Sequence, residues 1–151
     1  MINMVTARKL KEAGMAWNPG DGDRFTVPDR GLDDRVFVIN DMATIIEMLQ
    51  GAPVVSFHGT PEWALDYLYL GETIWLPSEE QLRAALQNRL LDAGTAVYDL
   101  LYADGVYTCR FEWQGEALAF QGDSAAEAYA AALLALPGEE EPGDSSGLPV
   151  E

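Results

Sequence analysis

The sequence of 151 residues contains one cysteine, one histidine and no long apolar run. A single cysteine, Cys109, excludes an internal disulfide and fits a reducing compartment. No apolar stretch approaches the roughly 18 residues that a membrane-spanning helix needs. The basic residues near the N-terminus are not followed by the apolar segment of a secretory signal. We therefore expect a cytoplasmic protein with no membrane partner.

Positive charge is also scarce. Nine Lys and Arg residues face 25 Asp and Glu residues, and the net charge is −16 at pH 7. A protein this acidic lacks the positive surface that neutralises phosphates, so we expect no direct nucleic-acid binding. The same charge favours a protein partner with a basic surface. The composition leaves both a monomer and a homodimer open.

Motifs for cofactor and metal chemistry are missing as well. The sequence has no phosphate-binding glycine loop, no G-x-G-x-x-G and no zinc-type Cys/His spacing. Six aspartates between residues 21 and 41 could attract a hard cation. However, they do not follow the EF-hand spacing, and three arginines are interleaved with them. We expect no cofactor and no metal site.

The hydrophobic fraction is 48%, which is ordinary for a globular protein and sufficient for a core. We predict one compact domain over residues 1–137. It divides into a β-rich half, residues 1–59, and a second half, residues 60–137, with the order α-β-β-β-α. The predicted fold class is α+β, with helices and antiparallel sheet. Residues 138–151 are rich in Pro, Gly, Ser and acids, which predicts a disordered acidic tail.

The chain begins with a predicted helix that Asn3 or Thr6 could cap. The alternation of polar and apolar residues predicts a strand at residues 24–27. A charged loop is expected at residues 29–35, and a short apolar strand follows at residues 36–39.

Residues 44–49 are ambiguous. Asp41 could cap a helix there, whereas the β-branched run Thr44-Ile45-Ile46 favours a strand. We predict a hairpin in which residues 44–49 pair with residues 53–57.

The next segment is predicted to contain two helices around a short strand. The first helix runs from Thr60 to Gly71, and the strand covers residues 73–76. The second helix follows the capping box of residues 78–81 and ends at Gly94.

From residue 96 onwards the apolar residues recur with a period of two, which is typical of strands. Three strands are predicted between residues 96 and 120, and Asp104-Gly105 forms the turn between the first two. A second capping box, Ser124-x-x-Glu127, begins the last helix. The order helix, three-stranded meander, helix is similar in topology to the double-stranded-RNA-binding domain. The paired lysines of that family are replaced here by acidic and small residues, so its nucleic-acid role is not implied.

His58 is the candidate for catalysis, because an imidazole base would have to come from it. It lies at a predicted strand-to-helix turn, and no catalytic motif surrounds it. The alternative is a partly exposed histidine that ends a strand. Cys109 occupies an inward-facing position, which is typical of a buried, inert thiol. These residues favour a protein that is not an enzyme.

Aromatic residues could form a partner surface. Most are expected in the core, but Tyr69 and Tyr102 lie off the predicted buried stripes. We therefore expect a non-catalytic protein-binding or adaptor module. Two alternatives stay open: a small hydrolase or transferase that uses His58 with a nearby acid, and an acidic mimic of nucleic acid.

Five short motifs together resemble a family of short, uncharacterised bacterial proteins. They are Gly22-Asp23-Arg24-Phe25, Asp33-Asp34-x-Val36-Phe37, Gly59-Thr60-x-Glu62-Trp63-Ala64-Leu65-Asp66, Trp75-Leu76-Pro77-x-Glu79-x-Gln81-Leu82 and Ala128-Tyr129-Ala130-x-Ala132-Leu133-Leu134. Some members are labelled pilus-assembly proteins, a name shared with ATPases that need a phosphate-binding loop, and this sequence contains no such loop. The resemblance implies a small soluble bacterial protein and supplies no catalytic residues.

Overall fold

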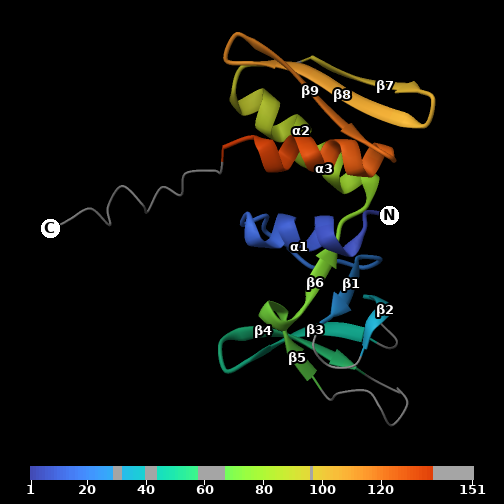
Figure 1. Cartoon of the computed structure of the whole chain (residues 1–151). Helices are drawn as coiled ribbons and strands as arrows, with labels where there is room; N and C mark the ends of the chain where they lie inside the picture. The colour runs from blue at the N-terminus through green and yellow to red at the C-terminus, as the bar shows by residue number, and fades with distance from the viewer. Residues whose placement is uncertain (29–31, 40–43, 58–66, 96, 138–151) are drawn as a thin grey trace, which may run out of the picture.

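The computed structural model describes residues 1–28, 32–39, 44–57, 67–95 and 97–137 (Figure 1). These residues form an α+β fold with three α-helices and three small antiparallel sheets, which confirms the predicted class. Among the described helices, none has the length and apolar content needed to cross a bilayer.

Helix α1 (Met4–Glu12) begins at the predicted cap. The Asn3 side chain accepts a hydrogen bond from the Thr6 backbone N–H at 2.8 Å, so Asn3 is the capping residue. Ala7 and Leu10 are buried on the inward side of the helix.

The first sheet has the strand order β2-β1-β6. It consists of β1 (Arg24–Val27), β2 (Leu32–Val38) and β6 (Ile74–Leu76). The prediction of a charged loop up to residue 35 was wrong, because β2 already begins at Leu32, which pairs with Val27. Backbone pairing with β1 outweighs the low strand propensity of the two aspartates that follow.

The second sheet contains the predicted hairpin. Strand β3 (Thr44–Leu49) pairs with β4 (Ala52–Phe57), so the strand interpretation of residues 44–49 is confirmed. Gln50 and Gly51 both have positive φ, at 53° and 83°, as a two-residue hairpin turn requires.

The helix predicted from Thr60 to Gly71 is wrong at its end. Strand β5 (Tyr67–Tyr69) pairs with β4, and the short 3-10 helix η1 (Leu70–Glu72) follows. Aromatic residues favour strands, and the open edge of β4 supplies the partner. The beginning of the predicted helix lies outside the described residues.

The C-terminal part follows the prediction closely. Helix α2 (Glu79–Asp92) begins with the complete capping box of Ser78 and Gln81. Three strands form a meander with the order β7-β8-β9, and helix α3 (Ala125–Ala135) follows. The strands are β7 (Tyr98–Ala103), β8 (Val106–Trp113) and β9 (Glu116–Gly122).

The second predicted capping box forms only in part. The Ser124 hydroxyl accepts from the Glu127 backbone N–H at 3.1 Å. The Glu127 carboxylate instead accepts from the Asn3 backbone N–H at 2.8 Å and from the Thr6 hydroxyl at 2.7 Å. Glu127 therefore joins α3 to the start of α1, where the helix dipole favours negative charge.

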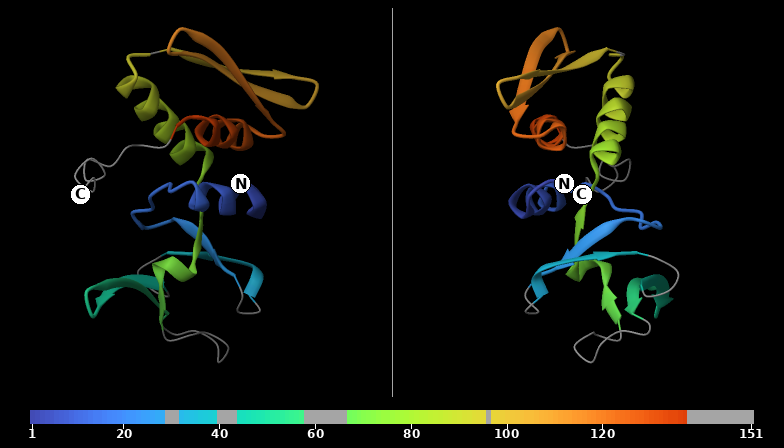
Figure 2. Two further views of the ribbon diagram at one scale, coloured as in Figure 1. Left: turned by 60° about the vertical axis from the view of Figure 1, so that its left-hand side comes forward. Right: turned by 90° about the vertical axis from the view of Figure 1, so that its right-hand side faces the viewer.

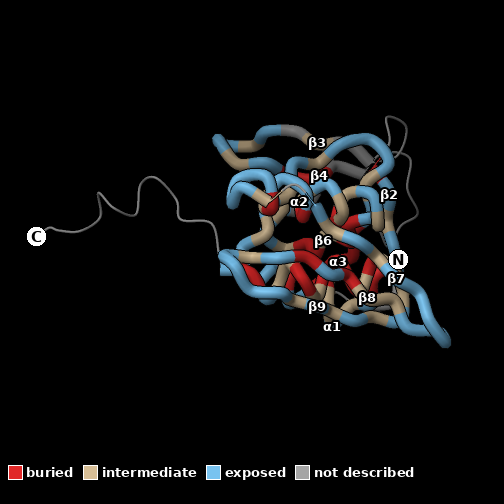
Figure 3. The backbone as a smooth tube through the Cα atoms, turned by 90° about the horizontal axis from the view of Figure 1, so that it is seen from above, coloured by how far each residue is buried: buried red, intermediate tan, exposed pale blue. Residues whose placement is uncertain are grey.

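The elements lie in layers. The β7–β9 sheet packs on α2 and α3, α1 lies beneath them, and the other two sheets follow (Figures 1 and 2). The larger core lies between the three helices, β6 and one face of the β7–β9 sheet. A smaller core gathers around Phe25, Val27, Ile39 and Val55. Buried positions therefore concentrate along α3 and β6, and exposed ones at the rim (Figure 3).

Candidate functional site

The β7–β9 sheet has one covered face and one open face. Residues such as Leu100, Cys109 and Phe111 point towards α3 and α2. None of the described helices lies over the opposite face (Figures 1 and 2). We call this opposite side the outer face. Cross-strand pairing places its residues side by side: Asp99, Leu101, Thr108, Arg110, Glu112, Ala117, Ala119 and Gln121.

Apolar side chains are exposed on and beside the outer face. Leu101 is 44% exposed, and Val97 and Val106 are exposed at either end of β7. A groove of about 650 Å³ lies over the end of the sheet. It is lined by Gly94, Thr95, Val97, Tyr98, Asp99, Arg110, Phe111, Glu112, Ala117, Leu118 and Ala119.

Acidic residues lie near both ends of the sheet: Asp104 in the β7–β8 turn, and Glu112 and Glu116 beside the β8–β9 turn. Arg110 is the one basic residue between Tyr98 and Gly122, and it donates two hydrogen bonds of 2.9 Å to the Asp99 carboxylate. The hydrogen bond from Arg110 lowers the pKa of Asp99, and the same pair raises the pKa of Arg110. Because this ion pair occupies Arg110, the remaining acids of the segment give the sheet a negative rim.

The two tyrosines predicted as contacts lie far apart. Tyr102 is 63% exposed at the tip of the β7–β8 hairpin, with its ring 4.9 Å from that of Tyr107. Tyr69 is 38% exposed on β5, in the sheet at the other end of the molecule (Figure 1). They therefore cannot form one surface. Tyr102 pairs with Tyr107, so its side chain lies on the helix-facing side of the sheet and not on the outer face.

The candidates for catalysis and metal binding have different outcomes. His58 lies outside the described residues, so its role stays a prediction. Cys109 is fully buried, and burial, with a smaller contribution from Asp99, raises the pKa of its thiol to about 11. A thiol with so little thiolate at neutral pH is a poor nucleophile. Within the described ranges, no group of three or more His, Cys, Asp or Glu residues could hold a metal ion.

Asp23, one of the six clustered aspartates, serves the fold. Its carboxylate accepts hydrogen bonds from the Trp17 indole at 2.9 Å and from the Gly20 backbone N–H at 3.0 Å. The Gln81 amide donates a third bond of 2.7 Å from the start of α2. Asp23 therefore fixes the loop after α1 against the capping box of α2.

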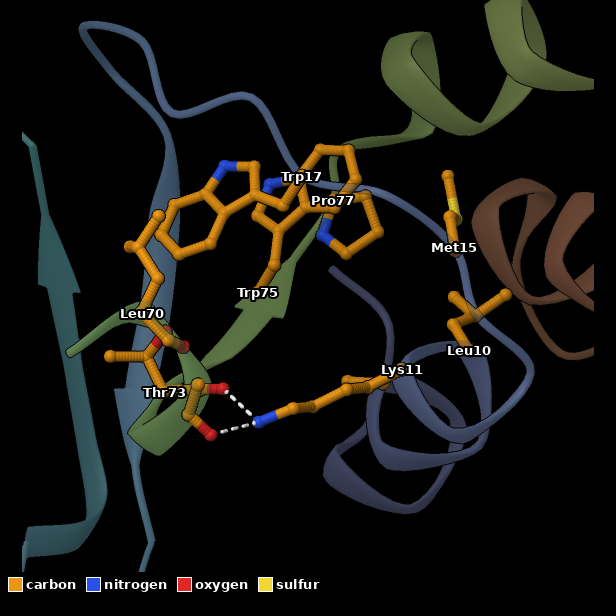
Figure 4. A pocket seen from close by; sticks show the side chains of 10 residues that line it. Leu10, Lys11, Met15, Trp17, Leu70, Thr73, Trp75 and Pro77 are labelled. Carbon is orange, nitrogen blue, oxygen red and sulfur yellow. Dashed lines mark hydrogen bonds between the residues drawn. The ribbon is translucent and has the colours of Figure 1, made fainter. Parts of the chain in front are cut away.

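A second cavity, which we did not expect from the sequence, lies between α1 and β6. Its volume is about 220 Å³, and its lining is mainly apolar (Figure 4). The rings of Trp17 and Trp75 stack within it, 6.0 Å apart and inclined by 7°. The Lys11 ammonium donates to the carbonyl oxygens of Gly71 and Thr73, both at 2.7 Å.

Comparison with protein-family models, with curated proteins and with solved structures found no match for this chain. The resemblance to the family of short bacterial proteins therefore stays a prediction.

Proposed function

We propose that this chain is a non-catalytic protein-binding module of the bacterial cytoplasm, and that its outer face holds a partner with a basic surface. The observation that carries the proposal is a sheet face that combines exposed apolar residues with a negative rim. Interfaces between proteins have this composition: an apolar centre inside a charged border.

The apolar part would supply the affinity. Burying a leucine side chain such as that of Leu101 contributes about 1.5–3 kcal/mol relative to leaving it exposed. Val97, which precedes β7, and Val106, which pairs with Ala103 at the far end of β7, add exposed apolar surface.

The charge would select the partner. Acids on the rim attract a basic surface over long range and repel an acidic one, so they raise the association rate and suppress wrong partners. Such steering weakens with salt, because the screening length falls to about 10 Å at 0.1 M ionic strength.

This proposal fits the molecule better than an acidic mimic of nucleic acid. A mimic would need carboxylates at regular intervals along one surface. On the outer face, Asp99 is paired with Arg110, and Arg110 also lies next to Glu112 along β8, so a positive group stands between the two carboxylates.

A pair of matched variants tests the proposal. Leu101→Lys places a positive charge on the outer face, and Leu91→Lys makes the same change at a 62%-exposed position of α2. Each protein is immobilised and exposed to bacterial lysate at low and high salt, after circular dichroism has shown that it is folded.

We expect a basic protein that the wild type and Leu91→Lys capture at low salt, and that Leu101→Lys does not. High salt should weaken its capture. A captured protein that both variants retain equally, or whose capture is independent of salt, would count against the outer face as the binding surface.

A further inference from the structure

The cavity between α1 and β6 has the features of a small ligand site. Its walls bring together side chains from α1, the loop after it, η1 and β6 (Figure 4). Besides the stacked pair Trp17 and Trp75, they include Leu10, Met15, Leu70 and Pro77. The volume of about 220 Å³ exceeds the roughly 150 Å³ of an engineered apolar cavity that accepts benzene. The cavity therefore has room for one aromatic ring with a short substituent.

Lys11 places a positive charge at the end of the cavity away from the tryptophans (Figure 4). An ammonium group has three N–H donors. Gly71 and Thr73 accept two of them, and the third has no acceptor among the described residues. Partial burial, and then the nearby Arg8, lower the pKa of Lys11, and none of the causes of this shift is an acidic neighbour. In a chain with a net charge of −16, this cation has no anionic partner among the residues that the structure describes.

Trp75, which lines the cavity, also carries an unsatisfied polar atom. The indole Nε1 of Trp75 is buried and has no hydrogen-bond partner within the described part of the chain. By contrast, the indole Nε1 of Trp17 donates to Asp23. Unpaired buried donors are rare in folded proteins, because an unmade hydrogen bond is costly.

We propose that this cavity binds a small aromatic carboxylate. The ring would lie against the indole surfaces and Met15, and the carboxylate would accept the third N–H of Lys11. Aromatic faces and a sulfur atom provide favourable contacts for a flat apolar ring. A charge-assisted hydrogen bond from Lys11 would fix the orientation of the ligand. The site is separate from the outer face and does not depend on the function proposed above.

Phenylacetate is a suitable probe, and phenylacetamide is its neutral control. Each is titrated into the ¹⁵N-labelled full chain, and the indole N–H resonances of Trp17 and Trp75 are followed by NMR. We expect saturable shifts of both resonances with phenylacetate. Phenylacetamide should bind about tenfold more weakly or worse, because it has no carboxylate to accept the charge-assisted hydrogen bond from Lys11.

Two matched variants in α1 test whether the Lys11 ammonium binds the carboxylate of the ligand. Lys11→Met keeps an apolar stem and removes the ammonium, whereas Lys9→Met makes the same change at an exposed position outside the cavity. Lys11→Met should weaken phenylacetate binding about tenfold or more and leave phenylacetamide unchanged. Lys9→Met and the outer-face variant Leu101→Lys should bind both probes as the wild type does.

Three results would overturn the proposal. The first is the absence of any saturable shift at Trp17 and Trp75 up to millimolar phenylacetate. The second is equal weakening by Lys9→Met and Lys11→Met, which would indicate general anion attraction. The third is equal affinity for phenylacetate and phenylacetamide.

Discussion

Gly122, the last residue of β9, is the described glycine at which an added Cβ atom meets the most severe clash. A Cβ atom added there would lie 2.5 Å from the Ala128 backbone nitrogen and 2.7 Å from both the carbonyl carbon and the Cβ of Glu127. Ordinary van der Waals contact requires 3.4–4 Å. The obstructing atoms belong mainly to the backbone of the first turn of α3, so no side-chain rotation can relieve the clash.

Gly122→Ala must therefore push α3 away from the sheet. Overpacking of this kind costs about 1–3 kcal/mol, and occasionally more. For a chain of this size, each kcal/mol lowers the midpoint of thermal unfolding by about 2–4 °C. We expect a decrease of about 2–12 °C, measured by circular dichroism, and a lower urea midpoint with an unchanged slope.

Gly71→Ala is the matched control. No heavy atom lies within 4 Å of a Cβ built on Gly71, and its backbone does not have the positive φ that favours glycine. This variant should be neutral or stabilised by about 0.4–1 kcal/mol, because alanine restricts the unfolded chain. Equal midpoints for Gly122→Ala and the wild type would refute the argument, as would an equal loss in Gly71→Ala.

Other predictions concern polar and titrating groups. Glu127→Ala removes two hydrogen bonds to the start of α1 and should lower the free energy of unfolding by about 1.5–3 kcal/mol. The control Glu116→Ala, at an exposed position, should change it by no more than about 0.5 kcal/mol. Equal urea midpoints for the two variants would contradict the role of Glu127 in joining α3 to α1. Cys109 should resist thiol reagents in the folded protein at about pH 8 and react once urea unfolds it; rapid labelling of the native state would disprove its burial. Burial raises the pKa of the Cys109 thiol from 9.0 to about 11. Burial, and to a smaller extent the nearby Tyr98, raises the pKa of Tyr129 from 10.0 to about 12. The folded state therefore keeps protons that the unfolded state releases, so the urea midpoint should fall as the pH rises from about 9 towards 12, and a constant midpoint would show that these pKa values are not raised.

Local signals in the sequence predicted most of the C-terminal part. A capping box specifies its own hydrogen bonds, and so Ser78 and Gln81 mark the start of α2. Asp104 and Gly105 both adopt positive φ, as their hairpin turn requires. These elements could be predicted because residues close in sequence determine them.

The segment of residues 67–69 could not be predicted in the same way. Its residues are compatible with the end of a helix and also favour a strand, and pairing with strand β4 decides between the two. The Glu127 carboxylate is a similar case, since its partners on α1 lie more than 120 residues away. Sequence spacing carries no information about such contacts.

The two candidate sites also differ in how far the sequence could predict them. The inward-facing position of Cys109 predicted that β8 has a second, outward side, but not that none of the described helices would cover this side. The cavity could not be inferred at all, because Lys11 and Trp75 come from distant segments, and each alone is an ordinary surface or core residue. Neither site follows from a motif.

The most direct test of the proposed function is the affinity of the captured basic protein, measured by titration calorimetry against three proteins: the wild type, Leu101→Lys and Leu91→Lys. If the outer face is the binding surface, Leu101→Lys should lower the affinity at least about tenfold, equivalent to about 1.4 kcal/mol, and Leu91→Lys should not lower it. Equal affinity for all three proteins would contradict the proposal.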